Sequence, residues 1–396
     1  MNKMTVEDVD VRGKRVLVRV DFNVPLDERT GEITDDNRIR AALPTIKYLI
    51  ERGAKVILMS HLGRPKGRVV ERMKLGVAAQ RLAEILGQPV AMAPDCVGPD
   101  VEKMVATMKA GDVLMLENLR FHAEEEAGDA SFARALARLG DVLVNDAFGA
   151  AHRAHASVSV ITEYLPAVAG FLMEKEVANL GQILGNPARP FAALLGGAKI
   201  SDKVSMLQNI MGKVDSVMVG GGMAATFLKA RSYEIGRSLL EADMLETANR
   251  LMALAQKEKV NLMLPVDVVV ADEVSDEAKT EVVPVEKIPK EKKIVDMGPK
   301  TIDNFRRELR KCKTVFWNGP VGIFEMPRFA RGTQELAKLL AGLGAMTVIG
   351  GGSTAEAVIA MGLADKMSFV STGGGASLEF LSGEKLPGVE ALPDRK

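Results

Sequence analysis

Short apolar runs alternate with stretches of helical spacing along almost the whole chain. In the first half each run contains three or four consecutive apolar residues, and the runs cover 15–20, 55–60, 112–116 and 141–146. Uninterrupted apolar runs of this length are typical of strands that are buried on both faces of a parallel sheet. Between them, 37–53 and 75–87 place apolar residues at helical intervals and end in glycine, which predicts two helices with glycine stop signals.

The second half repeats this alternation. Its predicted strands cover 191–196, 216–221, 261–271, 314–319, 346–351 and 367–374. Alternation of strand and helix favours parallel sheets with right-handed crossovers. The segment 267–296 lacks helical spacing, and we expect it to form a meander on the edge of the second sheet.

A chain of 396 residues is long enough for two domains of just under 200 residues each. The boundary is predicted between 165 and 190, where a helical stretch is followed by "GNPARP". We therefore expect an α/β protein made of two Rossmann-like domains, 1–170 and 186–382, with mainly parallel sheets and a linker helix over 171–185.

Composition excludes several classes of function. Fifty-two basic residues balance 52 acidic ones, so attraction to nucleic acid or to an anionic membrane is not expected. Cys96 and Cys312 are the only cysteines, which argues against a disulfide framework or a cysteine-ligated zinc site. The first ten residues lack the apolar core of a signal peptide and no apolar run reaches 18 residues, so a cytoplasmic location is expected.

Cationic and polar side chains gather where the predicted strands of the first half end. Because ligands of open parallel sheets bind at the carboxyl ends of the strands, these residues are expected to converge on one small anion. They are Asp21, Asn23, Arg38, His61, Arg64, Arg120, His152 and Arg153. For any one arginine among them an exposed loop charge is the better interpretation, but successive strand ends that each carry Arg or His favour the anion pocket.

Glycine runs follow strands of the second half, in "LGGAK", "VGGGMA", "IGGGSTA" and "STGGGAS". Two of them fit the dinucleotide pattern G-x-G-x-x-A, although glycine also serves close packing of helix on strand. Neither match is the first strand-to-helix turn of the chain, and a Walker A motif is absent, so a polyphosphate site of another kind is favoured.

Two lysines and one glutamate complete the candidate chemistry. Lys199 and Lys203 are four residues apart and are expected on one face at a helix start, where an anion such as a transferring phosphoryl group would balance them. Glu325 ends the apolar loop "WNGPVGIFE", which contains the only tryptophan, and its carboxylate could accept hydrogen bonds from ribose hydroxyls. Solvated lysines and a surface glutamate are the alternative interpretation.

Together these segments resemble the phosphoglycerate kinase family nearly from end to end. The motifs that carry the resemblance include "RVLVRVDFNVPL", "LMSHLGRP", "LENLRFHAEEE", "NDAFGAAHRAHAS", "LLGGAKISDK", "VFWNGPVGIFE" and "IGGGSTAEAV". The resemblance implies reversible transfer of the acyl phosphate of 1,3-bisphosphoglycerate to ADP in glycolysis, giving 3-phosphoglycerate and ATP. It also implies a monomer that closes by hinge bending, Mg²⁺ carried by the nucleotide, and a C-terminal tail, 383–396, packed on the first domain.

By motif, the resemblance assigns individual residues. Catalytic roles fall to Arg38, Lys199 and Gly352. The phosphoglycerate would be bound by Asp21, Phe22, Asn23, Arg38, His61, Leu62, Gly63, Arg64, Arg120 and Arg153. The nucleotide would be bound by Lys199, Lys203, Gly298, Glu325, Gly351, Gly352, Ser353 and Thr354.

One position departs from the family pattern. The family usually has aspartate after the third glycine of this motif, whereas this chain has Ser353. Serine keeps a hard oxygen for Mg²⁺ but lacks the charge.

Two other classes of function compete with this interpretation. An NAD(P)-dependent dehydrogenase would explain the two G-x-G-x-x-A matches, and a two-lobed binding protein would explain two halves that hold small anions. Dinucleotide affinity without ADP or ATP binding would select the dehydrogenase, and a coupled assay for ATP formation decides between an enzyme and a binding protein.

Overall fold

The computed structural model describes residues 2–395, which form two compact units. One unit comprises Met1–Ala178 with Lys385–Lys396, and the other comprises Asn179–Glu384. The division falls inside helix α6 (Phe171–Gly185), the segment expected as the linker. No helix within the described part of the chain combines the length and apolarity needed to cross a bilayer.

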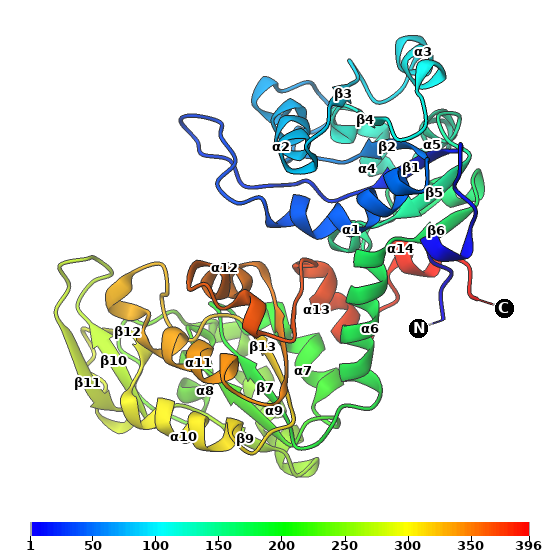
Figure 1. Ribbon diagram of the computed structural model, residues 1–396. Coiled ribbons are helices and arrows are strands. Elements are labelled where there is room, and N and C mark those ends of the chain that lie inside the picture. Colours follow the sequence, from blue (N-terminus) through cyan, green and yellow to red (C-terminus); the bar gives the residue numbers. More distant parts are fainter. Residues whose placement is uncertain (1, 396) are drawn as a thin grey trace. The chain divides into compact units, whose positions relative to one another are not determined.

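The first unit is built on a six-stranded, fully parallel sheet with the order β3-β4-β2-β1-β5-β6 (Figure 1). Its strands are β1 (Arg15–Arg19), β2 (Lys55–Met59), β3 (Val90–Met92), β4 (Val113–Met115), β5 (Val142–Asn145) and β6 (Ala167–Ala169). Its helices are α1 (Asn37–Glu51), α2 (Gly76–Leu86), α3 (Pro99–Thr107), α4 (Ala123–Ala127), α5 (Ala130–Ala137) and α14 (Pro387–Glu390). The helices expected over 37–53 and 75–87 are confirmed, and α2 ends at Gly87 in the left-handed conformation.

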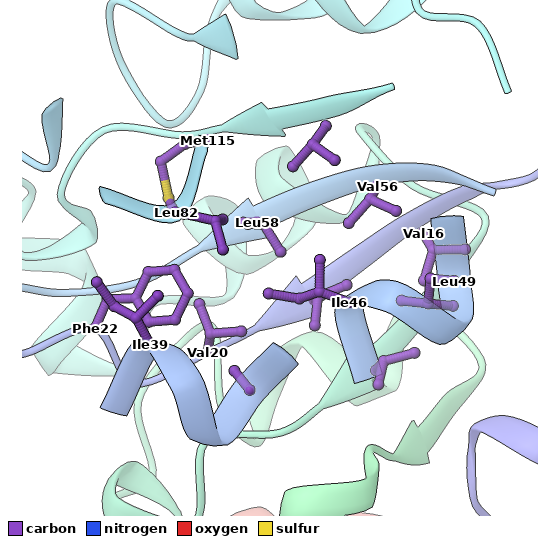
Figure 2. Close-up of a cluster of buried hydrophobic side chains, with 14 of the residues drawn as sticks. Val16, Val20, Phe22, Ile39, Ile46, Leu49, Val56, Leu58, Leu82 and Met115 are labelled. Carbon is purple, nitrogen blue, oxygen red and sulfur yellow. The ribbon is translucent and has the colours of Figure 1, made fainter. Parts of the chain in front are cut away.

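Alternate residues of the central strands point to opposite faces of this sheet, and both faces are buried. Val16, Val56 and Leu58 belong to one hydrophobic cluster, into which α1 inserts Ile46 and Leu49 (Figure 2). On the other face, the intervening strand residues are also inaccessible to solvent; they are Leu17, Ile57, Leu114 and Leu143. Burial on both faces is the reason that these strands are apolar at nearly every position.

The second unit contains another six-stranded parallel sheet, with the order β15-β14-β13-β7-β8-β9. Its strands are β7 (Phe191–Leu195), β8 (Ser216–Val219), β9 (Asn261–Met263), β13 (Thr314–Asn318), β14 (Met346–Gly350) and β15 (Phe369–Val370). Its helices are α7 (Val204–Ile210), α8 (Met223–Ala230), α9 (Leu245–Lys257), α10 (Pro299–Leu309), α11 (Arg331–Ala341), α12 (Gly352–Ala360) and α13 (Gly375–Leu381). Helix α10 buries Ile302, Phe305 and Leu309, one stripe of a 3.6-residue repeat, in the core that also holds Trp317.

Two expectations for the second unit are wrong. The apolar run 261–271 is not one strand, because the chain breaks after β9 and enters a different sheet as β10 (Asp267–Ala271). The meander is not an edge of the large sheet either. It forms a separate antiparallel sheet with the order β11-β10-β12, in which β11 covers Thr280–Pro284 and β12 covers Lys293–Met297. Pro265 lies in the break between the two strands and has no N–H to donate to a continuous ladder.

Residues after Lys385 return to the first unit and pack into it. The N–H of Gly388 donates to the carbonyl of Ala151 at 2.8 Å, and Asn145 Nδ2 donates to the carbonyl of Gly388 at 3.2 Å. Leu386 and Val389 are almost fully buried. The first unit is therefore assembled from both ends of the described chain.

Candidate active site

Ends of parallel strands in the first unit bring the predicted anion-binding residues into one electrostatic cluster. Asp21 follows β1, His61 follows β2, and Arg120 lies in the short helix η3 (Leu119–Phe121) after β4. Burial lowers the pKa of His155 to about 4, and Arg120, Arg19, Arg153 and His152 all act in the same direction. The four cationic or basic groups that add to the effect of burial lie close to one another, and such a concentration of positive charge suits an anionic ligand.

Asp21 holds Arg38 in this cluster through an ion pair. Burial alone would raise the pKa of Asp21, but Arg38, and then His61 and Arg19, lower it to about 2. Asp21 is therefore ionised at any physiological pH. The Arg38 side chain remains 31% exposed, so part of its guanidinium faces solvent.

Gly63 joins the strand-end loops through its backbone. Its N–H donates to Asn23 Oδ1 at 2.8 Å, and its carbonyl accepts from Arg120 Nη1 at 3.0 Å. The residue has a φ of +65° and an added Cβ would lie 3.0 Å from the sulfur of Met73, so glycine fits this position best. Asn23, Gly63 and Arg120 are thus fixed as one set.

Asn118 is a buried link that the sequence reasoning did not single out. Its Nδ2 donates to the carbonyls of Leu62 and Met73, both at 2.8 Å, and its Oδ1 accepts from the N–H of Arg120 at 3.1 Å. The side chain has no solvent exposure. Asn118 therefore sets the position of Arg120 relative to the His61–Arg64 loop.

Arg19 is a second residue that was missed, because it lies inside an apolar strand. It is fully buried, donates to Ser157 Oγ at 2.9 Å, and its Nη2 lies 3.2 Å from His61 Nδ1. Ser157 in turn donates to the buried carboxylate of Glu125 at 2.5 Å. The signal that could have revealed this network is the charge itself, since an arginine in a strand buried on both faces needs a partner.

The side chains of four residues predicted to bind phosphoglycerate take no part in the ion pair and hydrogen bonds described above. Phe22 and Leu62 have side chains in the hydrophobic core, so only their backbone groups are available to a ligand. Arg64 and Arg153 are exposed to solvent. The remaining predicted residues make the contacts described above: Asp21 with Arg38, Gly63 with Asn23 and Arg120, and His61 with Arg19.

A cavity of about 540 Å³ lies in the second unit, within the size range of small-molecule sites. Its apolar wall includes Leu239, Val268 and Val274, and its polar lining includes Glu325 and Ser353. Apolar walls with few polar groups are suited to a flat aromatic base with hydroxyl groups at its edge.

Glycines form the floor of this cavity, where three loops lie in contact. The N–H of Gly197 donates to the carbonyl of Pro320 at 2.8 Å, and the N–H of Gly221 donates to that of Val321 at 3.0 Å. Gly221 has a φ of +67°, and an added Cβ would lie 2.7 Å from the nitrogen of Gly197. Close packing therefore explains glycine here, and the same closeness brings backbone groups to the cavity surface.

Lys203 and Lys199 are not equivalent, and the expected shared helix face is wrong. The helical segment begins only at Ser201, as the short helix η6 (Ser201–Lys203), so Lys199 precedes it and is exposed. Lys203 is buried with 8% exposure and donates to Asn318 Oδ1. Burial lowers the pKa of Lys203 to about 8.

Helix α12 begins at the predicted phosphate-binding turn. Gly351 precedes it with a φ of +88°, and an added Cβ would approach Asn318 Nδ2 to 2.9 Å. The N–H groups in the first turn of a helix have no partner within the helix, and with the helix dipole they favour an anion. Thr354 does not face this turn freely, because its Oγ1 accepts from the N–H of Gly319 at 2.6 Å.

Gly298 serves packing in this structure. An added Cβ would lie 2.3 Å from Asp267 Cγ, and Asp267 accepts the N–H groups of Lys300 and Thr301 at the start of α10. Its neighbour Met297 lines the cavity.

A cationic cluster at one parallel sheet and a glycine-floored cavity beside a buried lysine at another define an enzyme of the phosphotransferase class. The phosphoglycerate kinase family model matches residues 6–384. Over 395 residues the chain is 57% identical to a phosphoglycerate kinase of Pelotomaculum thermopropionicum, with 100% of both chains covered. It is 53% identical to that of Dictyoglomus turgidum, with 99% and 98% covered.

Solved structures that resemble this one are also phosphoglycerate kinases. The phosphoglycerate kinase of Coxiella burnetii superposes with a TM-score of 0.87 at 39% identity, and that of Pyrococcus horikoshii with 0.87 at 32%, each covering 98% of both chains. This chain belongs to the phosphoglycerate kinase family, whose reaction is the glycolytic phosphoryl transfer between 1,3-bisphosphoglycerate and ADP. The resemblance, the fold class and the enzyme class inferred from sequence are confirmed, and the dehydrogenase and binding-protein alternatives fall away.

Proposed function

We propose that the cationic cluster binds 3-phosphoglycerate or 1,3-bisphosphoglycerate, and that the cavity of the second unit binds ADP or ATP. The observation that carries this proposal is the set of cations at the strand ends: Arg38 pairs with the ionised Asp21, and Arg120 is fixed on the loop that contains Gly63. A small substrate with a phosphate and a carboxylate offers the negative charges that such a cluster lacks.

The reaction needs no side-chain nucleophile. An acyl phosphate is already activated, so the protein must align the donor and acceptor oxygens and neutralise the equatorial oxygens of the moving group. Arg38 and Lys199, both partly or fully exposed, are the cations proposed for that role, together with the N–H of Gly352 at the start of α12. Lys203 is proposed to bind nucleotide phosphate, and Glu325 to accept ribose hydroxyls.

Mg²⁺ is proposed to arrive with the nucleotide, where it neutralises phosphate charge. The residues present are compatible with it, because Ser353 lies at the cavity and offers a hard oxygen. Ser353 would offer its hydroxyl oxygen to Mg²⁺, and the first-turn N–H groups of α12 would bind nucleotide phosphate. Phosphate oxygens and water would supply the other metal ligands.

We further propose a monomeric, cytoplasmic enzyme whose two units approach each other when both ligands are bound. The support is chemical, since an acyl phosphate is hydrolysed if water reaches it. Small-angle scattering should show compaction mainly in the ternary complex. An unchanged radius of gyration with both ligands saturating would contradict hinge closure.

The decisive experiment is a coupled assay with ATP and 3-phosphoglycerate on wild type, Arg38→Ala and Arg40→Ala. Arg40 is a matched control on the same helix, and it pairs with Asp36 at 2.8 Å outside the cluster. We expect Arg38→Ala to lower kcat at least about a hundredfold, and Arg40→Ala to leave it unchanged. Equal activity of the two variants would refute the assignment of the cluster.

A further inference from the structure

Three potential metal ligands lie together outside the residues assigned to substrate. Asp95 and Cys96 follow strand β3, and His122 follows η3. A carboxylate oxygen, the thiol sulfur and an imidazole nitrogen lie within 4.8 Å of one another. His122 Nε2 is 2.7 Å from Asp95 Oδ1, and the imidazole ring is stacked on Phe132 with 5.2 Å between ring centres.

The cluster is open on one side and closed on the other. Cys96 has no solvent exposure, whereas the Asp95 and His122 side chains are 46% and 29% exposed. A cation can therefore enter past the carboxylate and the imidazole, with the sulfur at the base of the site. An entry path is one of the requirements for a metal site.

Two carboxylates, those of Asp95 and Glu125, act on the Cys96 thiol. Burial raises the pKa of the Cys96 thiol well above its usual range, and the Asp95 and Glu125 carboxylates raise it further. The hydrogen bond to Asp95 raises the pKa of His122. The Asp95 carboxylate beside the thiol and the imidazole attracts a dication, and a bound dication would compensate the thiolate charge that burial disfavours.

We propose that Asp95, Cys96 and His122 bind Zn²⁺, with water in the fourth position. The cysteine count argued against such a site because it takes no account of the imidazole and the carboxylate that the fold brings beside this one thiol. Sulfur, imidazole nitrogen and carboxylate oxygen are the donors that Zn²⁺ prefers, whereas Mg²⁺ takes oxygen ligands. Donors on tetrahedral zinc lie about 3.3 Å apart, so side-chain adjustments of up to about 1.5 Å complete the site.

Zinc binding at this cluster is coupled to protons and to a loop of the first unit. The thiol proton, and the imidazolium proton where present, pass to solvent as the Zn–S and Zn–N bonds form, so affinity rises with pH. The metal would join the segment after β3 to η3, which carries Arg120. We therefore expect Zn²⁺ to raise the Tm of the protein.

The test is a zinc titration of the chelator-treated full chain, without nucleotide, in competition with a chromogenic chelator. We expect one Zn²⁺ per chain with a Kd of about 10 μM or lower, and at least about tenfold weaker binding in Cys96→Ala and in His122→Gln. Cys312→Ala is the matched control, because it removes the other buried cysteine, and it should bind like wild type.

Cadmium provides an independent measurement. Cd²⁺ bound to wild type should give an ultraviolet sulfur-to-metal charge-transfer band that Cys312→Ala retains. If Cys96→Ala fails to fold, this band and the His122→Gln titration still decide. Absence of stoichiometric zinc binding would overturn the proposal, as would unchanged affinity in His122→Gln or a cadmium band that persists in folded Cys96→Ala. The cluster would then be an ordinary ion pair beside a buried thiol.

Discussion

Replacing Lys203 by methionine should stabilise the free protein in a pH-dependent manner. The ammonium group is buried, and its pKa falls from 10.5 to about 8 because burial disfavours the charge. A shift of this size corresponds to about 3 kcal/mol of unfavourable free energy at neutral pH, where Lys203 is protonated in both states. Methionine keeps the length of the side chain and removes the charge.

The sign follows from proton binding. Between pH 8 and 10.5 the unfolded chain holds a proton on Lys203 that the folded chain has released, so the stability of wild type rises with pH. Wild type should gain about 2 kcal/mol relative to Lys203→Met between pH 7 and 9.5. The variant also leaves Asn318 Oδ1 without its donor, at a cost of about 1–3 kcal/mol. That cost does not depend on pH, so it cancels from the pH dependence of the difference.

Urea unfolding followed by tryptophan fluorescence measures this difference. Trp317 is the only tryptophan of the chain, and it lies next to Asn318 in β13, so its signal reports on the second unit. The free energy of unfolding of wild type should rise by about 2 kcal/mol relative to that of Lys203→Met as the pH rises from 7 to 9.5. Curves that stay parallel over this range would show that Lys203 is not desolvated, and the reasoning would fail.

Three further predictions concern the proposed sites. Lys199→Ala should lower turnover far more than it weakens phosphoglycerate binding, because its charge acts mostly on the transferring group; near-normal kcat would reduce Lys199 to a surface charge. Asn118→Ala should raise the KM for 3-phosphoglycerate and leave the KM for ATP unchanged, since it frees Arg120 from the His61–Arg64 loop; equal changes in both KM values would indicate a general loss of structure. Ser353→Asp should tighten ADP binding by about 1 kcal/mol with Mg²⁺ and weaken it without, as calorimetry can measure; equal effects in both conditions would place Ser353 away from the metal.

The large parallel sheets could be predicted because their strands are apolar on both faces. The short strands β3 and β6 were missed, since three residues give too little pattern to distinguish a strand from a loop. The separate sheet of β10, β11 and β12 could not be predicted either, because the sequence shows a break at Pro265 but not which strands pair after it.

Candidate site residues were predictable where a charged side chain follows an apolar strand, as at Asp21 and His61. Arg19 and Asn118 were not, because their importance comes from partners that are distant in sequence: Arg19 contacts Ser157, and Asn118 contacts Leu62 and Met73. Family resemblance pointed to particular glycine turns, but it could not show that Gly298 packs against Asp267 or that Lys203 is buried.

The return of the segment after Lys385 to the first unit determines the order in which a ribosome can complete the fold. Asn145 and Ala151 receive their partner Gly388 only after the whole of Asn179–Glu384 has been made. At about 5–20 residues per second, that stretch of about 200 residues takes about 10–40 s. During this interval the second unit can finish folding while the first, although synthesised earlier, still exposes the apolar surface that Leu386 and Val389 will cover. The nascent chain therefore closes its first unit last.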